Sequence, residues 1–180
     1  MAVLCFLLLA VFPGIVSAQG KAPANRTNNA IPGKILQSDS PLRIASDRME
    51  ANQKDRTVLF EGHVVVQQDD LTITGKQLKV YTAEGVKDPA AQSAMVDKID
   101  RIEVEGDVTI SQQDKVATAD RAVYYHEEQK IVLSGHPSVA QGQDTIQGRL
   151  ITLLIAQGKS IVEGGAETPV QAVLHPAKKE

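Results

Sequence analysis

Four histidines are the side chains best suited to hold a metal ion in this chain. They are His63, His126, His136 and His175, and none of them stands in an HxH or HExxH spacing. Because such spacings place two imidazoles on one face of a strand or helix, their absence argues against a metal site. His63 and His136 each directly follow a glycine, and Asp107 takes the same position after a third glycine. We therefore expect outward-facing polar residues at turns, and no bound metal.

Side chains for covalent or acid–base catalysis are equally sparse. Ser134-Gly135-His136 pairs a hydroxyl with an imidazole, but neither a G-x-S-x-G elbow nor an acid in a familiar order accompanies it. The carboxylate pairs Asp69-Asp70 and Glu127-Glu128 stand where hairpin turns are expected, and turns favour acidic residues through local backbone hydrogen bonds. No glycine-rich phosphate loop is present. We predict no catalytic residue and no cofactor, hence a protein that binds or carries something rather than an enzyme.

The N-terminal residues predict export. Residues 1–18 form an apolar stretch ending in Val16-Ser17-Ala18, which supplies small residues for signal peptidase, so we predict cleavage before Gln19. The only cysteine, Cys5, lies within this signal peptide and leaves no thiol for chemistry or disulfides afterwards. Residues 19–40 are rich in Asn, Pro, Gly, Lys and Thr, and we expect a flexible arm there.

Composition excludes one class of partner and describes the interior. The formal net charge is −3 and no basic run exceeds Lys178-Lys179, which argues against nucleic acid. Beyond residue 18 the chain has no Trp, one Phe and three Tyr, so its interior must be mostly Val, Ile and Leu. Such side chains can close a compact core or line a slot for flexible acyl chains, and composition does not separate these two interpretations.

Residues 41–174 have the pattern of an all-β domain. Short segments with alternating Val, Ile and Leu recur here, such as 58–60, 63–66, 71–73 and 102–104. Alternation with a period of two is typical of half-buried strands. Residues 175–180 are expected to form a frayed tail.

An internal repeat organises these strands. Its glycines are spaced 44, 29 and 29 residues apart, and they are Gly62, Gly106, Gly135 and Gly164. An apolar strand that opens with a basic residue precedes each of them. The longer first spacing predicts a surface insertion between Tyr81 and Ile99. Since one repeat cannot bury its apolar face alone, the repeats must stack or roll around one interior.

A second position recurs in phase with these glycines. Thirteen residues after each of the first three, a small residue precedes a charged one, at Gly75-Lys76, Ala119-Asp120 and Gly148-Arg149, and Ser46-Asp47 fits an incomplete copy at the front. We expect each glycine to permit a turn or a bulge, and each small residue to permit close approach at a corner.

Several of these segments resemble one known family. Pro41–Asp47 is similar to the P-I-x-I-x-S-D opening of the periplasmic lipopolysaccharide-transport proteins of the LptA/OstA type, and Phe60–Val66 to their F-x-G-N-V-x-V strand pair. Glu105–Ile110 and Leu133–Val139 repeat the second pattern. The chain departs from it where histidines replace Asn or Asp, and where Pro137 replaces Val. A proline needs a position without a ladder N–H, so that strand should begin late or lie at an edge.

The resemblance implies both a fold and a function. The fold is a single twisted, open β-jellyroll, built from short antiparallel strands in repeats of about 29 residues. The function is that of a periplasmic bridge protein, which shields the lipid A acyl chains of lipopolysaccharide in a hydrophobic groove and passes it from the inner to the outer membrane. The implied partners are lipopolysaccharide, homologous β-jellyroll domains of an inner-membrane-anchored protein and of an outer-membrane barrel protein, and further copies joined end to end.

Alternation and in-phase position assign the lining of that groove. The expected lipid-binding residues are Leu42, Ile44, Val58, Phe60, Val64, Val66, Ile73, Leu78, Val80, Ile102, Val104, Val108, Ile110, Tyr124, Ile131, Leu133, Val139 and Ile151. Arg43, Lys76, Arg101 and Arg121 lie near strand ends, where we expect ordinary solvated charges. Two alternatives remain: a periplasmic structural or adhesive β-repeat protein with a closed aliphatic core, and a carbohydrate-active β-solenoid enzyme. The enzyme is the weaker, because glycosidic cleavage normally needs two carboxylates in a cleft.

Overall fold

The computed structural model describes residues 40–83 and 99–176. The predicted signal peptide, the predicted arm up to residue 39, most of the predicted insertion between Tyr81 and Ile99, and the last four residues lie outside the described residues. Within the described ranges, no helix has both the length and the apolar character needed to cross a membrane.

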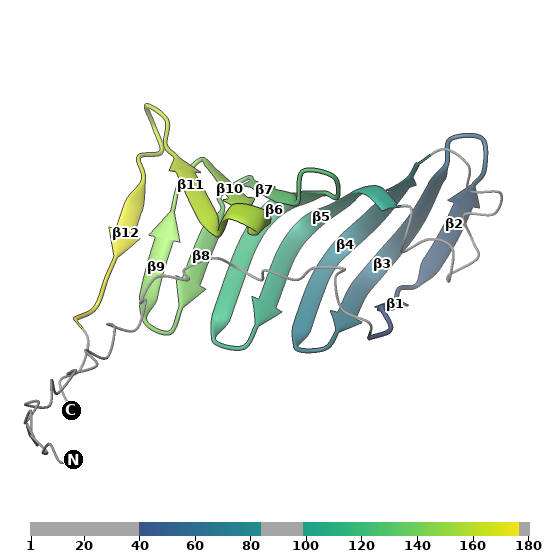
Figure 1. The fold of residues 1–180 in the computed structure, drawn as a ribbon, viewed down its shortest axis with the longest axis horizontal. Coiled ribbons are helices and arrows are strands. Elements are labelled where there is room, and N and C mark those ends of the chain that lie inside the picture. The colour runs from purple at the N-terminus through teal and green to yellow at the C-terminus, as the bar shows by residue number, and fades with distance from the viewer. Residues whose placement is uncertain (1–39, 84–98, 177–180) are drawn as a thin grey trace, which may run out of the picture.

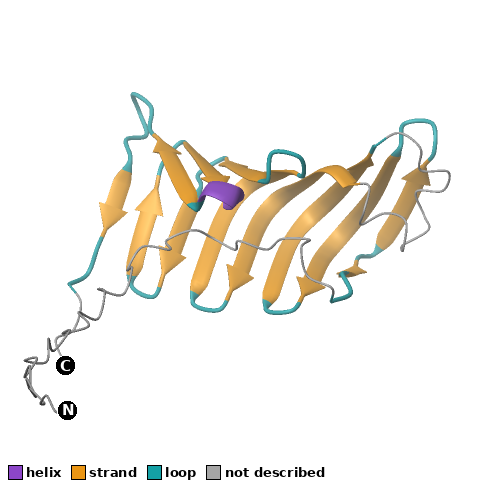
Figure 2. Cartoon of the chain, viewed as in Figure 1, coloured by secondary structure: helices purple, strands orange, loops and turns teal. Residues whose placement is uncertain are grey.

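The described residues form one antiparallel sheet, accompanied by a single 3-10 helix, η2 (Ile155–Gln157) (Figure 2). The strands are β1 (Arg43–Ala45), β2 (Arg48–Asn52), β3 (Thr57–Gln68), β4 (Leu71–Thr82), β5 (Ile99–Gln112), β6 (Lys115–Tyr125), β7 (Lys130–Ser134), β8 (Ser138–Gln141), β9 (Asp144–Gln147), β10 (Leu150–Leu154), β11 (Lys159–Glu163) and β12 (Gln171–Val173). The predicted all-β class and its antiparallel pairing are confirmed.

The strand pairings divide this sheet into two halves. One end of β3 pairs with β2 and the other with β1, and β6 likewise pairs with β7 through one end and with β8 through the other. The β2–β11 half-sheet therefore has the order β2-β3-β4-β5-β6-β7-β10-β11, and the β1–β12 half-sheet has the order β1-β3-β4-β5-β6-β8-β9-β12. The long strands β3 to β6 pass through both halves, side by side in the middle of the sheet (Figure 1).

The repeat glycines lie where the long strands bend from one half-sheet into the other. Register shifts occur at Glu61/Val64 and Glu105/Val108, and Gly62 and His63 both have positive φ, +76° and +45°. These are β-bulges, so β3 and β5 continue through their glycines. At Gly135 the chain bends too, but the strand is interrupted: β7 ends at Ser134, β8 begins at Ser138, and both pair with β6 in the same direction. Of the bulge and the turn that the sequence left open, the bulge occurs at Gly62 and Gly106, and the chain does not reverse at Gly135.

Neighbouring strands approach closely at the corners where they bend, as the small residues of the repeat predicted. A Cβ added to Gly75 would lie 2.6 Å from Cγ1 of Val104 on the next strand. Pro137 is fully buried and precedes β8, which begins at Ser138, so this strand begins late as expected. Asp69-Asp70 and Glu127-Glu128 do stand in the turns between consecutive strands. The remaining strand residues alternate inward and outward, and the inward ones form one apolar interior between the half-sheets.

Candidate functional site

The strand register aligns the inward side chains into rows that run across the whole sheet. In the β2–β11 half-sheet, consecutive partners make one row of Met49, Phe60, Leu78, Val104, Ala122, Leu133, Ile151 and Val162. In the β1–β12 half-sheet, the corresponding row is Ile44, Val66, Ile73, Ile110, Ala117, Val139, Ile146 and Ala172. Directly paired residues project from the same face of a sheet. Two apolar rows, one in each half-sheet, therefore line the interior from its N-terminal to its C-terminal end.

All eighteen residues expected to line a groove lie in this interior. Thirteen belong to the buried cluster, and Leu42, Ile44, Ile73, Ile102 and Val139 are partly buried against it. The sequence reasoning missed further members, which are Leu71, Ile99, Ala117, Ala119, Ala122, Leu153, Ile155 and Val162. Extending the alternation from Ile151 to Leu153 would have found one of them. The alanines carry too little apolar surface to stand out in a hydrophobic pattern.

The interior is closed in the middle and open near its C-terminal end. Val58 and Leu133 have no exposed surface, and both belong to the buried apolar cluster. Between β8, β9, β10 and β11 lies a cavity of about 290 Å³, lined by Val139, Ile146, Ile151, Leu153, Gly158, Ser160 and Val162. This volume is at the lower end of the roughly 300–1,000 Å³ of small-molecule sites. The lining carries no charged side chain, so the cavity suits an apolar ligand.

Ion pairs follow the corner on which the strands bend. Asp47 lies 2.8 Å from Nδ1 of His63, Lys76 Nζ 2.7 Å from Asp107, Asp120 3.2 Å from Nδ1 of His136, and Arg149 3.4 Å from Glu163. We call these the corner pairs. In each pair, one partner is the charged residue that follows the small residue of the repeat. The other partner is adjacent to a repeat glycine on the neighbouring segment. The hydrogen bond from Lys76 to Asp107, and the charge of Asp107, raise the pKa of Lys76.

The corner pairs explain an irregularity in the repeat. Asp107 stands where the other copies carry His63 and His136, because its neighbour across the corner is Lys76 rather than an aspartate. The histidines thus serve as partners of carboxylates. Among the described residues, no group of three or more His, Cys, Asp or Glu side chains could hold a metal ion.

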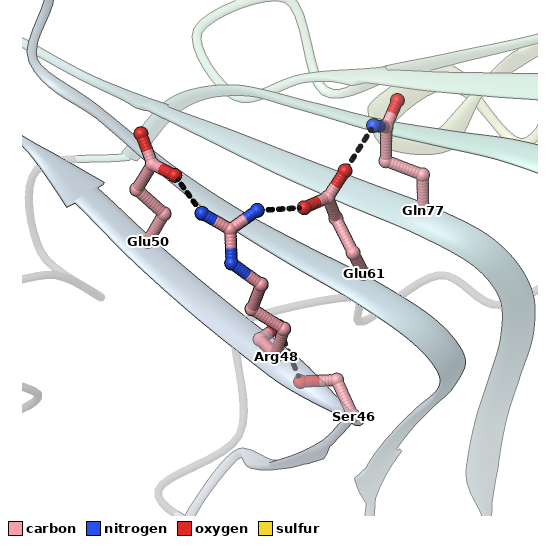
Figure 3. A network of polar contacts seen from close by, with 5 residues as sticks. All are labelled: Ser46, Arg48, Glu50, Glu61 and Gln77. Atoms are coloured by element: carbon pink, nitrogen blue, oxygen red, sulfur yellow. Dashed lines mark hydrogen bonds and ion pairs between the residues drawn. The ribbon is translucent and has the colours of Figure 1, made fainter.

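Basic residues on the outer face are also paired with carboxylates. Arg48 of β2 contacts both Glu50 and Glu61, and Gln77 donates to Glu61, so the edge strand is tied to β3 and β4 (Figure 3). Arg101 and Arg121 both lie 3.2 Å from the largely buried carboxylate of Glu103. Arg121 also lies 2.9 Å from a carboxylate oxygen of Glu105, so two carboxylates balance the two guanidinium charges.

Comparison with known proteins places this geometry in a family. The sequence profile of the LptA/(LptD N-terminal domain) LPS transport proteins matches residues 43–159. An uncharacterized protein from Rhizobium meliloti (strain 1021) is 28% identical over 162 residues, which cover 88% of this chain and 84% of that protein.

A solved structure has the same fold. It is the crystal structure of LptH, described as the LptA homologous periplasmic component of the conserved lipopolysaccharide transport device from Pseudomonas aeruginosa. The TM-score is 0.62 at 16% sequence identity, and the match covers 76% of this chain and 96% of LptH. The open β-jellyroll expected from the sequence is thereby confirmed.

Proposed function

Because the chain belongs to the LptA/LptD N-terminal domain family of LPS transport proteins, we propose that it binds lipopolysaccharide in the periplasm and carries it towards the outer membrane. The lipid A acyl chains occupy the apolar interior between the two half-sheets, where the eighteen residues expected from the sequence supply most of the contacts. The family consists of transport proteins and not of enzymes.

The observation that carries this proposal is the pair of apolar rows that opens into the cavity of about 290 Å³. Water makes an exposed acyl chain costly, at about 0.8 kcal/mol for each CH₂ group. A chain of about ten CH₂ groups therefore gains roughly 8 kcal/mol when it is fully buried. Because apolar side chains line the interior along its whole length, a lipid can advance through it without exposing its acyl chains to water again.

The closed middle of the interior must open before a lipid can pass through it. All strand pairings run within one half-sheet or the other, so the half-sheets meet through side chains except where β3 to β6 bend. Moving them apart breaks apolar contacts but no strand ladder. An entering acyl chain replaces those contacts with equivalent ones, which keeps the cost of opening low.

Photo-crosslinking tests whether acyl chains lie in the interior. A photoreactive p-benzoylphenylalanine at Phe60, which is inward and buried, is compared with the same group at Leu59, its outward neighbour. Ile44 provides a second inward position in the other half-sheet. With lipopolysaccharide carrying labelled acyl chains, we expect lipid adducts at Phe60 and Ile44 and none at Leu59. No adduct at either inward position would refute the carrier function.

A second candidate is a structural β-repeat protein with a closed aliphatic core. The complete burial of Val58 and Leu133 favours it, since both side chains are covered without any ligand. The same experiment separates the two functions, because a closed core excludes the lipid from Phe60.

We further propose that copies join end to end with one another and with homologous domains in the inner-membrane and outer-membrane partners. Each half-sheet ends in a strand that has one pairing neighbour among the described residues, β1 or β2 at one end and β11 or β12 at the other. Unpaired strand edges are templates for strand addition. Light scattering of the mature protein over a range of concentrations tests the assembly, and a constant monomer mass would refute self-association.

A further inference from the structure

A polar cavity lies at the β1 end of the sheet, opposite to the end formed by β11 and β12 (Figure 1). Its volume is about 380 Å³, within the roughly 300–1,000 Å³ of small-molecule sites. Apart from Pro41, every residue that lines it is polar, and these residues are Ser40, Arg43, Gln67, Gln68, Asp69 and Thr72. We call it the rim cavity. Its lining suits a hydrophilic ligand, in contrast to the apolar lining of the cavity between β8 and β11.

Three of these side chains form one row on the outer face of the β1–β12 half-sheet. Arg43 of β1 pairs with Gln67 of β3, which pairs with Thr72 of β4. Because neighbouring strands lie about 4.8 Å apart, the backbone positions of this row span roughly 10 Å. The row alternates with the inward residues Ile44 and Val66. The same strands therefore carry apolar side chains on their inner face and a guanidinium, an amide and a hydroxyl on their outer face.

The rim cavity also reaches the turn between β3 and β4, at the end of these strands that lies away from the bend. Asp69 stands in this turn with a φ of +51°. Gln68 is only 4% exposed, and its side-chain amide donates to the backbone oxygen of Ser40 at 3.0 Å, which holds Ser40 beside the end of β3. Gln68 pairs with Leu71, a member of the buried apolar cluster. The rim cavity therefore borders the apolar interior.

The guanidinium of Arg43 differs from the other charges near strand ends. Lys76, Arg101 and Arg121 all contact carboxylates. Within residues 40–83 and 99–176, Arg43 has no hydrogen-bond or ion-pair partner for its side chain, although it lines a cavity. The planar fork of donors on an arginine matches the oxygens of a phosphate or a carboxylate. An anion that enters the rim cavity can therefore bind Arg43 without displacing another partner.

We propose that the rim cavity binds a phosphorylated sugar of lipopolysaccharide while the acyl chains lie in the interior. This inference rests on the proposed function. Arg43 binds the phosphate, the amide of Gln67 and the hydroxyl of Thr72 contact sugar hydroxyls, and the carboxylate of Asp69 accepts hydrogen bonds from them. A sugar phosphate uses both the donors and the acceptors of this lining. Its position at the rim keeps these polar groups outside the apolar interior.

Calorimetric titration of the full chain with the deacylated, phosphorylated saccharide of lipopolysaccharide tests the rim cavity without acyl chains. We expect Arg43→Gln to weaken binding about tenfold or more, because a hydrogen bond to a charged group is lost. Lys54→Gln is the matched control, since Lys54 is an exposed cation in the turn between β2 and β3 and does not line the cavity. We expect this control to bind as the wild type does. Equal losses in the two variants would indicate general attraction of anions and would overturn the site.

Removing the phosphates from the saccharide tests the role given to Arg43. The wild type should bind the dephosphorylated saccharide as weakly as Arg43→Gln binds the phosphorylated one, and Arg43→Gln should cause no further loss. Thr72→Val keeps the shape of the side chain but removes its hydroxyl, so it should weaken the binding of both saccharides. If Arg43→Gln weakened the two saccharides equally, the contact between Arg43 and the phosphate would be refuted.

The outcomes separate the rim cavity from the carrier function. No binding of the saccharide, together with lipid adducts at Phe60 and Ile44, would overturn the rim cavity and leave the carrier function intact. Saccharide binding that depends on Arg43, without an adduct at either inward position, would support the rim cavity and refute the carrier function. A soluble peptidoglycan fragment, which carries carboxylates in place of phosphates, serves as a competitor. Displacement of the saccharide by an equal concentration of this fragment would overturn the assignment to a phosphorylated sugar.

Discussion

Gly62→Ala tests the physical basis of the corner on which the whole sheet bends. Two separate costs are expected. The backbone at Gly62 has φ +76°, and a residue with a Cβ pays roughly 1–2 kcal/mol in this left-handed region. The new methyl group would also lie 2.2 Å from Oδ2 and 2.9 Å from Cβ of Asp47. Because the Asp47 Cβ cannot rotate away, a shift of the strand is needed, which adds about 1–3 kcal/mol as in other overpacked sites.

Gly142→Ala is the control for the first cost alone. Gly142 has φ +59°, but nothing lies within 4 Å of an added Cβ. We expect Gly142→Ala to lower the free energy of unfolding by roughly 1–2 kcal/mol and Gly62→Ala to lower it by about 2–5 kcal/mol. In an Asp47→Gly background, which removes Cβ together with the carboxylate, the excess at Gly62 should fall.

Urea unfolding at one low protein concentration measures these differences, since a fixed concentration keeps any self-association constant. The reasoning is refuted if Gly62→Ala costs no more than Gly142→Ala. An excess that is unchanged by Asp47→Gly would show that the crowding comes from elsewhere.

Four further predictions address the interior and the ionisable groups of the protein. Leu133→Ala, at a fully buried side chain, should lower the free energy of unfolding by about 2–5 kcal/mol, and Val132→Ala on the outer face by less; equal losses in urea unfolding would contradict the assigned register. Lys76→Asp should lower the urea midpoint and the added Asp107→Lys should restore it, so a double-mutant cycle without favourable coupling would argue against the corner pair. Because Asp107 raises the pKa of Lys76, the stability from this pair is complete below the ordinary value of 10.5 and is lost as pH rises through the raised pKa. The difference in midpoint between wild type and Asp107→Asn should therefore shrink in strong alkali, and a constant difference would exclude this linkage. Burial raises the pKa of Tyr124 above 10.0, so the phenolate absorbance step that Tyr124→Phe removes should lie above pH 10.0; loss of a step at or below pH 10.0 would show that this phenol is not buried.

The interior could be predicted residue by residue because strand alternation is a local property. The polar neighbours of Val104 and Val108 already show which face each segment buries, and the structure confirms the burial of both. The bends could be located for a similar reason, since Gly62 and Gly106 supply the backbone freedom that a bulge requires and recur in phase. That these interior residues bind lipid stays a prediction.

Other features depend on neighbours that are distant in the chain. In the sequence, Asp107 interrupts the pattern of histidines that follow the repeat glycines. Only the fold shows that its partner across the corner is Lys76. The sequence also did not decide whether a strand runs through its glycine, as β3 does at Gly62, or is interrupted there, as between β7 and β8 at Gly135, where β6 pairs with the chain on both sides.

The amino-acid sequence by itself determined an all-β chain with a periodic bend and an aliphatic inner face, because period-two alternation, glycines and composition act over a few residues. Only the tertiary structure decided that this inner face forms two rows that open at the C-terminal end. There Ala172 extends the wall of the cavity and His175 holds the last strand to Asp144. The physical reason is that these contacts depend on the register between strands, and register is set when residues far apart in the chain pair with each other.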